Sequence, residues 1–384
     1  MKKTLAAVAV LGAFAGSAIA ADVTLYGIVD LGVNYTHVDM DGQGDDLDSF
    51  EMKSGQQSGS RWGLKGTEDL GNGLTVGFVL ENGFDADTGN DGQMFDRESM
   101  LFLEGGFGKL AFGRIGSFNQ GQGSFSLIGG LTPFGTSFGD YTVQAGNIFS
   151  VSTRYDNSIV YRTPSFAGFQ VTAMYSMGQS TDGKGEALTG AKENESSTDR
   201  YYGIAATYNN GPFAAYLAVD STNYKSLGVE HGDDMNDSLT VTLGGSWDFD
   251  VAKVYLGAQY FDEALMSSVG GILGKNSTFG LTSSKIEGFS VALGADAPIA
   301  GGKGMIGVGY LDASQSDFQE DYSGSDFDFT RWVVSLGYDY PLSKRTNIYG
   351  VMSYMDDDYD DNTAANDDKN PSAYTFMIGM RHRF

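Results

Sequence analysis

The sequence predicts an all-β protein: a closed antiparallel transmembrane β-barrel of about sixteen strands. Two observations carry this prediction. Apolar and polar residues alternate over segments of about ten residues, the length of a tilted membrane-spanning strand, and short turns alternate with long polar connections. Composition agrees, because 55 of 384 residues are glycine, 13% are aromatic and only 6 are proline, which favours many short strands over disorder. Cysteine is absent, so neither disulfides nor thiolate metal sites can hold the chain together.

The first segment of the chain is typical of a secretory signal peptide. Lys2 and Lys3 precede an apolar run over residues 5–14, which ends in small residues that include Ala18 and Ala20. A membrane anchor needs about 18 or more apolar residues, so the shorter run favours export and cleavage. We expect residues 1–20 to be a signal peptide and residues 21–384 to form one barrel domain, in which no helical membrane span is expected.

Period-two alternation is clearest at residues 238–247. Leu239, Leu243 and Trp247 fall on one face there, and serine, threonine and glycine fall on the other. Residues 169–177 and 331–339 alternate in the same way. One apolar face would also suit a soluble β-sandwich, so alternation alone leaves both folds open.

Connection lengths separate the two folds and favour the barrel. Short connections occur near residues 70–73, 105–108, 164–168, 209–212, 248–250, 298–302 and 341–344. Long polar connections occur near residues 37–59, 83–94, 118–153, 178–199, 221–237, 262–284, 312–328 and 356–372. This pattern predicts up-and-down hairpins whose tight turns lie at one end and whose long loops lie at the other. A barrel of about sixteen strands encloses an aqueous lumen.

Basic residues on the strands are expected to face that lumen. At the second predicted strand Trp62 and Leu64 take the lipid-facing positions, which points Arg61 and Lys65 inward. An arginine at a lipid-facing midplane position would cost ~2–4 kcal/mol, so the lumen is where these charges can sit.

The same parity places Arg97, Arg154 and Arg162 inward. It assumes that the neighbouring apolar residues face the lipid: Met100, Phe102, Tyr155, Ile159 and Tyr161. For each basic residue, an ordinary solvated charge on the inner wall is the alternative role.

Five segments resemble the general trimeric porins of Gram-negative outer membranes, in particular the beta-proteobacterial type. They are residues 22–30, 60–71, 110–114, 157–164 and 379–384. The resemblance implies a passive diffusion channel, or porin, for small hydrophilic solutes and ions in the outer membrane. It also implies a homotrimer in contact with lipid and lipopolysaccharide. No cofactor and no metal are expected.

The resemblance also implies a function for the connection 118–153. In the family the third external loop folds into the barrel and narrows it, and Arg61, Arg97 and Arg154 match the basic cluster across the pore. Pro133 and Gly135, followed by Asp140, resemble the tip of that loop, although Phe134 stands where the family has an acid. We therefore expect Asp140 to face the three arginines across a constriction with a modest anion preference.

The last strand carries an apolar stripe to the C-terminus. Tyr374, Phe376, Ile378, Met380 and Phe384 share one face. In the family this ending is the signal that the barrel-assembly machinery reads.

A match to a hydrolase motif lies in the wrong structural context for catalysis. Residues 135–139 match G-x-S-x-G, but that motif needs a strand that feeds a helix, and this copy lies in a Gly-rich loop, so no enzyme is expected. A substrate-selective channel or a surface adhesin remains the alternative to a diffusion channel.

The net charge and the acidic runs argue against nucleic-acid binding and against a calcium-binding loop. The net charge of −25, or −27 without Lys2 and Lys3, excludes nucleic acid, whose phosphates require clustered basic residues. The run 39–46 resembles part of a calcium loop but has Phe50 where the closing Glu belongs. We expect this run and the acids of 356–361 to lie in solvated external loops, with divalent cations bridging to lipopolysaccharide as an open alternative.

Overall fold

A computed structural model describes residues 23–42, 45–178, 198–224, 236–275, 281, 284–317, 326–361 and 369–384. The expected signal peptide and parts of several long connections lie outside these residues. Within the described residues, no helix is long and apolar enough to cross a membrane.

The described chain forms seventeen strand segments and four short helices. The strands are β1 (Thr24–Asp39), β2 (Leu47–Ser54), β3 (Arg61–Gly71), β4 (Leu74–Gly83), β5 (Glu98–Gly105), β6 (Gly108–Gly116), β7 (Arg154–Arg162), β8 (Phe169–Ser176), β9 (Arg200–Asn210), β10 (Phe213–Asn223), β11 (Leu239–Asp248), β12 (Lys253–Leu265), β13 (Lys285–Ile299), β14 (Gly302–Gln315), β15 (Phe327–Pro341), β16 (Thr346–Asp361) and β17 (Ser372–Arg383). The helices are η2 (Ile128–Gly130), α2 (Ala145–Ile148), η5 (Met266–Val269) and α3 (Gly271–Lys275).

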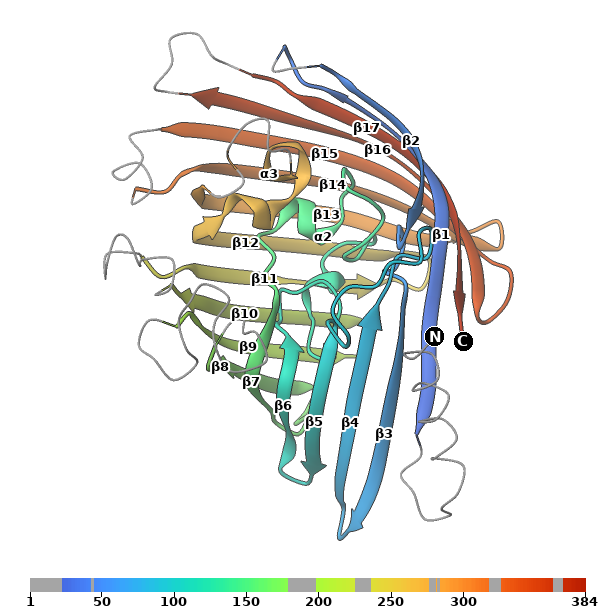
Figure 1. The fold of residues 1–384 in the computed structure, drawn as a ribbon, viewed down its shortest axis with the longest axis vertical. Helices are drawn as coiled ribbons and strands as arrows, with labels where there is room; N and C mark the ends of the chain where they lie inside the picture. Colours follow the sequence, from blue (N-terminus) through green and yellow to red (C-terminus); the bar gives the residue numbers. More distant parts are fainter. Residues whose placement is uncertain are drawn as a thin grey trace.

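The sheet closes on itself through β1. One edge of β1 pairs with β17, which Figure 1 shows as the blue and red strands side by side. The other edge pairs with β2 through residues 31–38 and with β3 through residues 24–28. Since β2 and β3 share one position, the seventeen segments make sixteen barrel strands, all paired antiparallel. The predicted closed barrel of about sixteen strands is confirmed.

The alternating segments predicted from sequence have the expected faces. Leu243 and Trp332 are 56% and 54% exposed, whereas Thr242 and Val333, their neighbours in the chain, are fully buried. Because the exposed side chains are apolar along nearly every strand, this outer face suits lipid rather than water.

Short turns join the strands at one end of the barrel. At the first of them Asn72 and Gly73 have φ values of 53° and 74°, the left-handed conformation that a tight two-residue hairpin requires. The β5–β6 and β13–β14 hairpins are similarly tight. In outer-membrane barrels these short turns face the periplasm.

The strands extend further toward the long-loop end than the sequence predicted. Residues 47–54, placed in a long connection, form β2, and β16 continues to Asp361. In β2 the apolar Phe50 and Met52 alternate with the charged Glu51 and Lys53, but the preceding acidic run obscured this period.

The long connection between β6 and β7, residues 117–153, is called the third loop below. Its helix α2 contacts β13 and β14, and α3, from the β12–β13 connection, contacts β16. Figure 1 shows both helices within the curve of the sheet. The loop therefore lies against the face of the barrel wall that is opposite to the exposed apolar face.

Candidate functional site

Large apolar side chains of the third loop pack on glycines of the wall. A Cβ atom on Gly307 would lie 3.0 Å from Cγ1 of Val143 and 3.4 Å from the ring of Phe134. At this contact the glycine belongs to the strand and not to the Gly-rich loop. Because glycine has no side chain, β14 leaves room for the loop at this position.

Hydrogen bonds fix the same loop to neighbouring strands. The backbone N–H of Val143 donates to Oγ of Ser335 at 2.9 Å, and that of Ser150 donates to Oε1 of Gln259 at 2.6 Å. Each bond satisfies a buried backbone donor, which would be costly to leave unpaired.

Three arginines converge on Gln122 of the third loop. Nη1 of Arg61 donates to Oε1 of Gln122, and Nη2 of Arg97 donates to the same oxygen at 3.2 Å. Nη2 of Arg154 donates to the backbone carbonyl of Gln122 at 3.5 Å. Arg61, Arg97 and Arg154, which the sequence grouped together, are therefore neighbours in the structure. We call these three residues with Gln122 the arginine cluster.

Two acids beside the arginine cluster were missed by the sequence analysis. Oε1 of Glu81 accepts a bond of 2.7 Å from Nε of Arg97, and Oε2 lies 3.6 Å from Nε of Arg61. Glu98 is buried, and its carboxylate accepts a bond of 2.8 Å from Oγ of Ser124 in the third loop. Strand alternation could have predicted that both acids face inward. Glu81 lies opposite Gly63 and therefore shares a face with Arg61, and Glu98 lies opposite Glu81.

The predicted orientation of Met100 and Phe102 is wrong. Both side chains are buried in the core cluster that includes third-loop residues, whereas Leu101 between them is 56% exposed. Apolar residues can face inward here because the loop covers them. Arg97 still reaches the arginine cluster because it precedes the first residue of β5 and does not follow the alternation of that strand.

The predicted outward orientation of Tyr155 is also wrong. Its buried ring stacks on that of Tyr201 with centroids 4.1 Å apart. The β6–β7 register shifts nearby and Asn157 has a φ of 51°, so alternation does not continue from Tyr161, which is exposed, to Tyr155.

Arg162 and Lys65 lie apart from the arginine cluster. Arg162 lies over the ring of Phe125 in the third loop at 4.5 Å and donates to Oγ1 of Thr172. Lys65 is exposed, with Nζ 5.1 Å from the ring centroid of Tyr26.

We expected Asp140 to face the arginine cluster, but its carboxylate pairs with two lysines instead. Its carboxylate binds Nζ of Lys53 at 2.6 Å and Nζ of Lys275 at 2.5 Å. Burial, the largest single influence, acts to raise the pKa of Asp140, but the two ammonium groups outweigh it and lower the pKa below its usual range. Lys53 lies in β2 and Lys275 at the end of α3, neither of which the sequence analysis singled out.

The acidic run at the end of β16 is not wholly solvated. Asp357 and Arg331 are both fully buried and form an ion pair with Nε–Oδ1 at 2.6 Å. Arg331 also donates to the backbone carbonyls of Asn147 in α2 and Val269 in η5. Asp357 of β16 pairs with a buried base on the neighbouring strand β15. Period-two alternation within one strand does not reveal such a pair.

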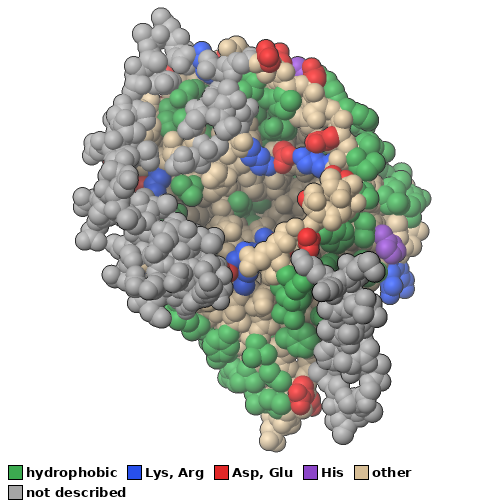
Figure 2. Space-filling model, viewed as in Figure 1, with side chains coloured by type: hydrophobic (Ala, Val, Ile, Leu, Met, Phe, Trp, Pro, Cys, Tyr) green, Lys and Arg blue, Asp and Glu red, His purple; other side chains and the backbone are tan. Residues whose placement is uncertain are grey.

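The C-terminal stripe lies on the outer face of β17. Tyr374, Phe376 and Ile378 are each about half exposed, and the terminal Phe384 accepts a backbone bond from Gly27 at 3.1 Å. Figure 2 shows the hollow of the barrel with basic and acidic side chains along its wall. The described residues contain no group of His, Cys, Asp and Glu that could hold a metal ion.

Comparisons with known proteins agree with this architecture. A family model described as Gram-negative porin matches residues 6–362. An outer membrane porin of Bordetella pertussis is 36% identical, with all of both chains covered, and one of Delftia acidovorans is 33% identical over 92% of this chain and 90% of its own. The solved structure of an anion-selective porin from Comamonas acidovorans is 28% identical, covers 95% of this chain and 100% of its own, and gives a TM-score of 0.67. The chain therefore belongs to the Gram-negative porins, which are passive channels of the outer membrane and not enzymes.

Proposed function

We propose that this porin prefers small anions modestly and that the arginine cluster sets the preference where the third loop narrows the lumen. The observation that carries the proposal is the convergence of Arg61, Arg97 and Arg154 on Gln122. Three guanidinium groups close together, held by a loop that is itself bonded to the wall, create a positive potential along the solute path.

The nearby acids only partly offset this charge. Two acids, Glu81 and Glu98, lie beside three arginines, and Glu81 is shared between two of them. Asp140 is held by two lysines instead. The exposed acids of the long loops are screened within ~8 Å at physiological salt, so they oppose anion entry mainly at low ionic strength. The anion-selective character stated for the Comamonas acidovorans relative supports the same preference.

Charge neutralisation tests the proposal. The double variant Arg61→Gln/Arg154→Gln should shift the reversal potential in a salt gradient toward cation selectivity while the barrel still assembles. Lys109→Gln/Lys253→Gln removes the same charge outside the arginine cluster and serves as the control. If both variants keep the selectivity of the unaltered channel, the arginine cluster does not set the preference. Saturable conductance would favour the substrate-selective alternative instead.

We further propose a homotrimer assembled in lipid and lipopolysaccharide. The apolar outer faces of β1 and β17, with Leu25, Phe376 and Ile378 exposed, support a contact between subunits. Only monomers after gentle detergent extraction, measured by mass, would contradict it.

Export and assembly complete the proposal. Residues 1–20 would be removed as a signal peptide, which the mass of the mature chain tests. Tyr374, Phe376, Ile378 and Phe384 would be read by the barrel-assembly machinery, so Phe384→Ser should reduce the amount of assembled porin. An unchanged amount would exclude that role.

A further inference from the structure

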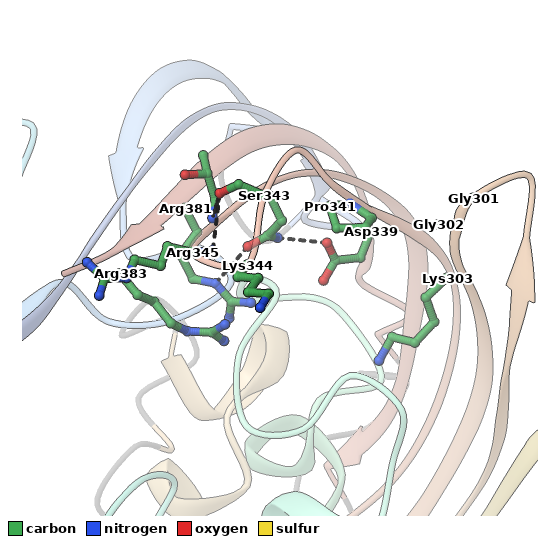
Figure 3. Close-up of a pocket in the computed structure, with 12 residues that line it drawn as sticks. Gly301, Gly302, Lys303, Asp339, Pro341, Ser343, Lys344, Arg345, Arg381 and Arg383 are labelled. Carbon is green, nitrogen blue, oxygen red and sulfur yellow. Dashed lines mark hydrogen bonds between the residues drawn. The ribbon is translucent and has the colours of Figure 1, made fainter.

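A strongly basic pocket lies at the short-turn end of the barrel, and none of its lining residues belongs to the third loop. It has a volume of about 480 Å³, and the charged residues that line it are Lys303, Lys344, Arg345, Arg381, Arg383 and Asp339. Figure 3 shows Lys344, Arg345, Arg381 and Arg383 on one side and Lys303 with Asp339 on the other. Five cations therefore surround one acid.

The single acid offsets only part of this charge. Asp339 accepts bonds of 2.7 Å from the side-chain amides of Gln57 and Asn347. Lys303 has a carboxylate of its own, since its Nζ lies 3.7 Å from Asp296. Among the described residues, no carboxylate lies within ion-pair distance of Lys344, Arg345 or Arg383.

Bonds among the neighbouring residues hold the pocket in shape. Nε of Arg381 donates to Oδ1 of Asn347 at 3.1 Å, and Nη1 donates to Oγ of Ser58 at 2.8 Å. The backbone N–H groups of Arg345 and Thr346 donate to Oγ of Ser343 at 3.1 Å. The guanidinium of Arg381 and the turn backbone are thus positioned before any ligand arrives.

We propose that this pocket binds a small polyvalent anion that carries two or more phosphoryl or carboxylate groups. Guanidinium groups match the geometry of both oxyanions in two-point contacts, and several cations around one pocket favour multiple charges over one. Because short turns face the periplasm, the site lies at the periplasmic mouth, and it shares no residue with the arginine cluster. The proposal does not require that the arginine cluster be selective.

Calorimetric titration of the purified full channel in detergent tests the site, with tripolyphosphate and citrate as probes. The variant Lys344→Gln/Arg345→Gln removes two exposed turn cations and should weaken binding at least about tenfold, because two charge-assisted bonds to the anion are lost. Lys109→Gln/Lys253→Gln, which removes the same charge near other short turns, should stay within about twofold. Circular dichroism checks that all variants remain β-barrels.

The outcomes are distinct. Binding of either probe that is lost in the first variant and kept in the control supports the site, and the probe that binds identifies the oxyanion. No binding of either probe, or equal loss in both variants, overturns it. Arg61→Gln/Arg154→Gln should retain binding, so the test remains informative even if the selectivity proposal fails. Arg383→Gln, on β17 rather than on the turn, should reproduce the loss.

Discussion

Arg331 and Asp357 form a two-point ion pair across β15 and β16, with Nε–Oδ1 at 2.6 Å and Nη2–Oδ2 at 2.7 Å, and both residues are fully buried. The remaining guanidinium nitrogen, Nη1, donates to Asn147 at 2.9 Å and to Val269 at 2.7 Å. One arginine thus joins the barrel wall to the third loop and to the β12–β13 connection.

Removing one member of this pair should lower the free energy of unfolding far more than removing both members. Asp357→Asn leaves a buried guanidinium without its counter-charge, at a cost of roughly 3–5 kcal/mol, whereas Arg331→Met/Asp357→Leu removes both charges and should cost much less. Urea unfolding in lipid vesicles would measure the difference. Glu104→Gln at an exposed pair is the control, with an effect under about 1 kcal/mol. A double variant as unstable as the single variant would exclude this explanation.

Glu81 should oppose the arginine cluster, so its neutralisation should act in the direction opposite to that of Arg61. Glu81→Gln keeps a group that can accept from Arg97 but removes the negative charge, and anion selectivity should rise. The measurement is the reversal potential in a salt gradient. A shift of the reversal potential toward cation selectivity would contradict the proposal that Glu81 reduces the anion preference.

The contacts of Asp140 should be insensitive to moderate acid. Because the pKa of this carboxyl is lower in the folded protein than its ordinary value of 3.8, its stabilising effect is fully present above 3.8 and is lost as the pH falls through the lower folded value. The conductance difference between the unaltered channel and Asp140→Asn should therefore stay constant from neutral pH to about 3.8. A difference that disappears between neutral pH and 5 would contradict the assignment.

Filling the space at Gly307 should displace the third loop. In Gly307→Val the added side chain meets Val143 and Phe134, at a cost of ~1–3 kcal/mol, and single-channel conductance should change. Ile306→Val, on the exposed face of the same strand, is the matched control and should leave conductance unchanged. Equal conductance in all three proteins would mean that the loop does not limit the current.

The sequence predicted the barrel because lipid imposes a simple rule on the outer face. Leu243 and Trp332 followed that rule, and the turns near 70–73 and 105–108 fixed the hairpins. The inner face was less predictable, because a loop folded against it offers apolar partners. Met100 and Phe102 face the loop for that reason, and the β6–β7 irregularity reversed the expected side of Tyr155. The partners of Asp140 come from β2 and α3, distant segments that no local pattern relates to it.

The reversal potential of the purified channel in a planar bilayer under a KCl gradient tests the central claim most directly. The predicted result is a conductance that rises with salt concentration without saturation, together with a reversal potential on the anion-selective side. A cation-selective reversal potential that persists at high salt, where the acidic loops are screened, would contradict the selectivity assigned to Arg61, Arg97 and Arg154.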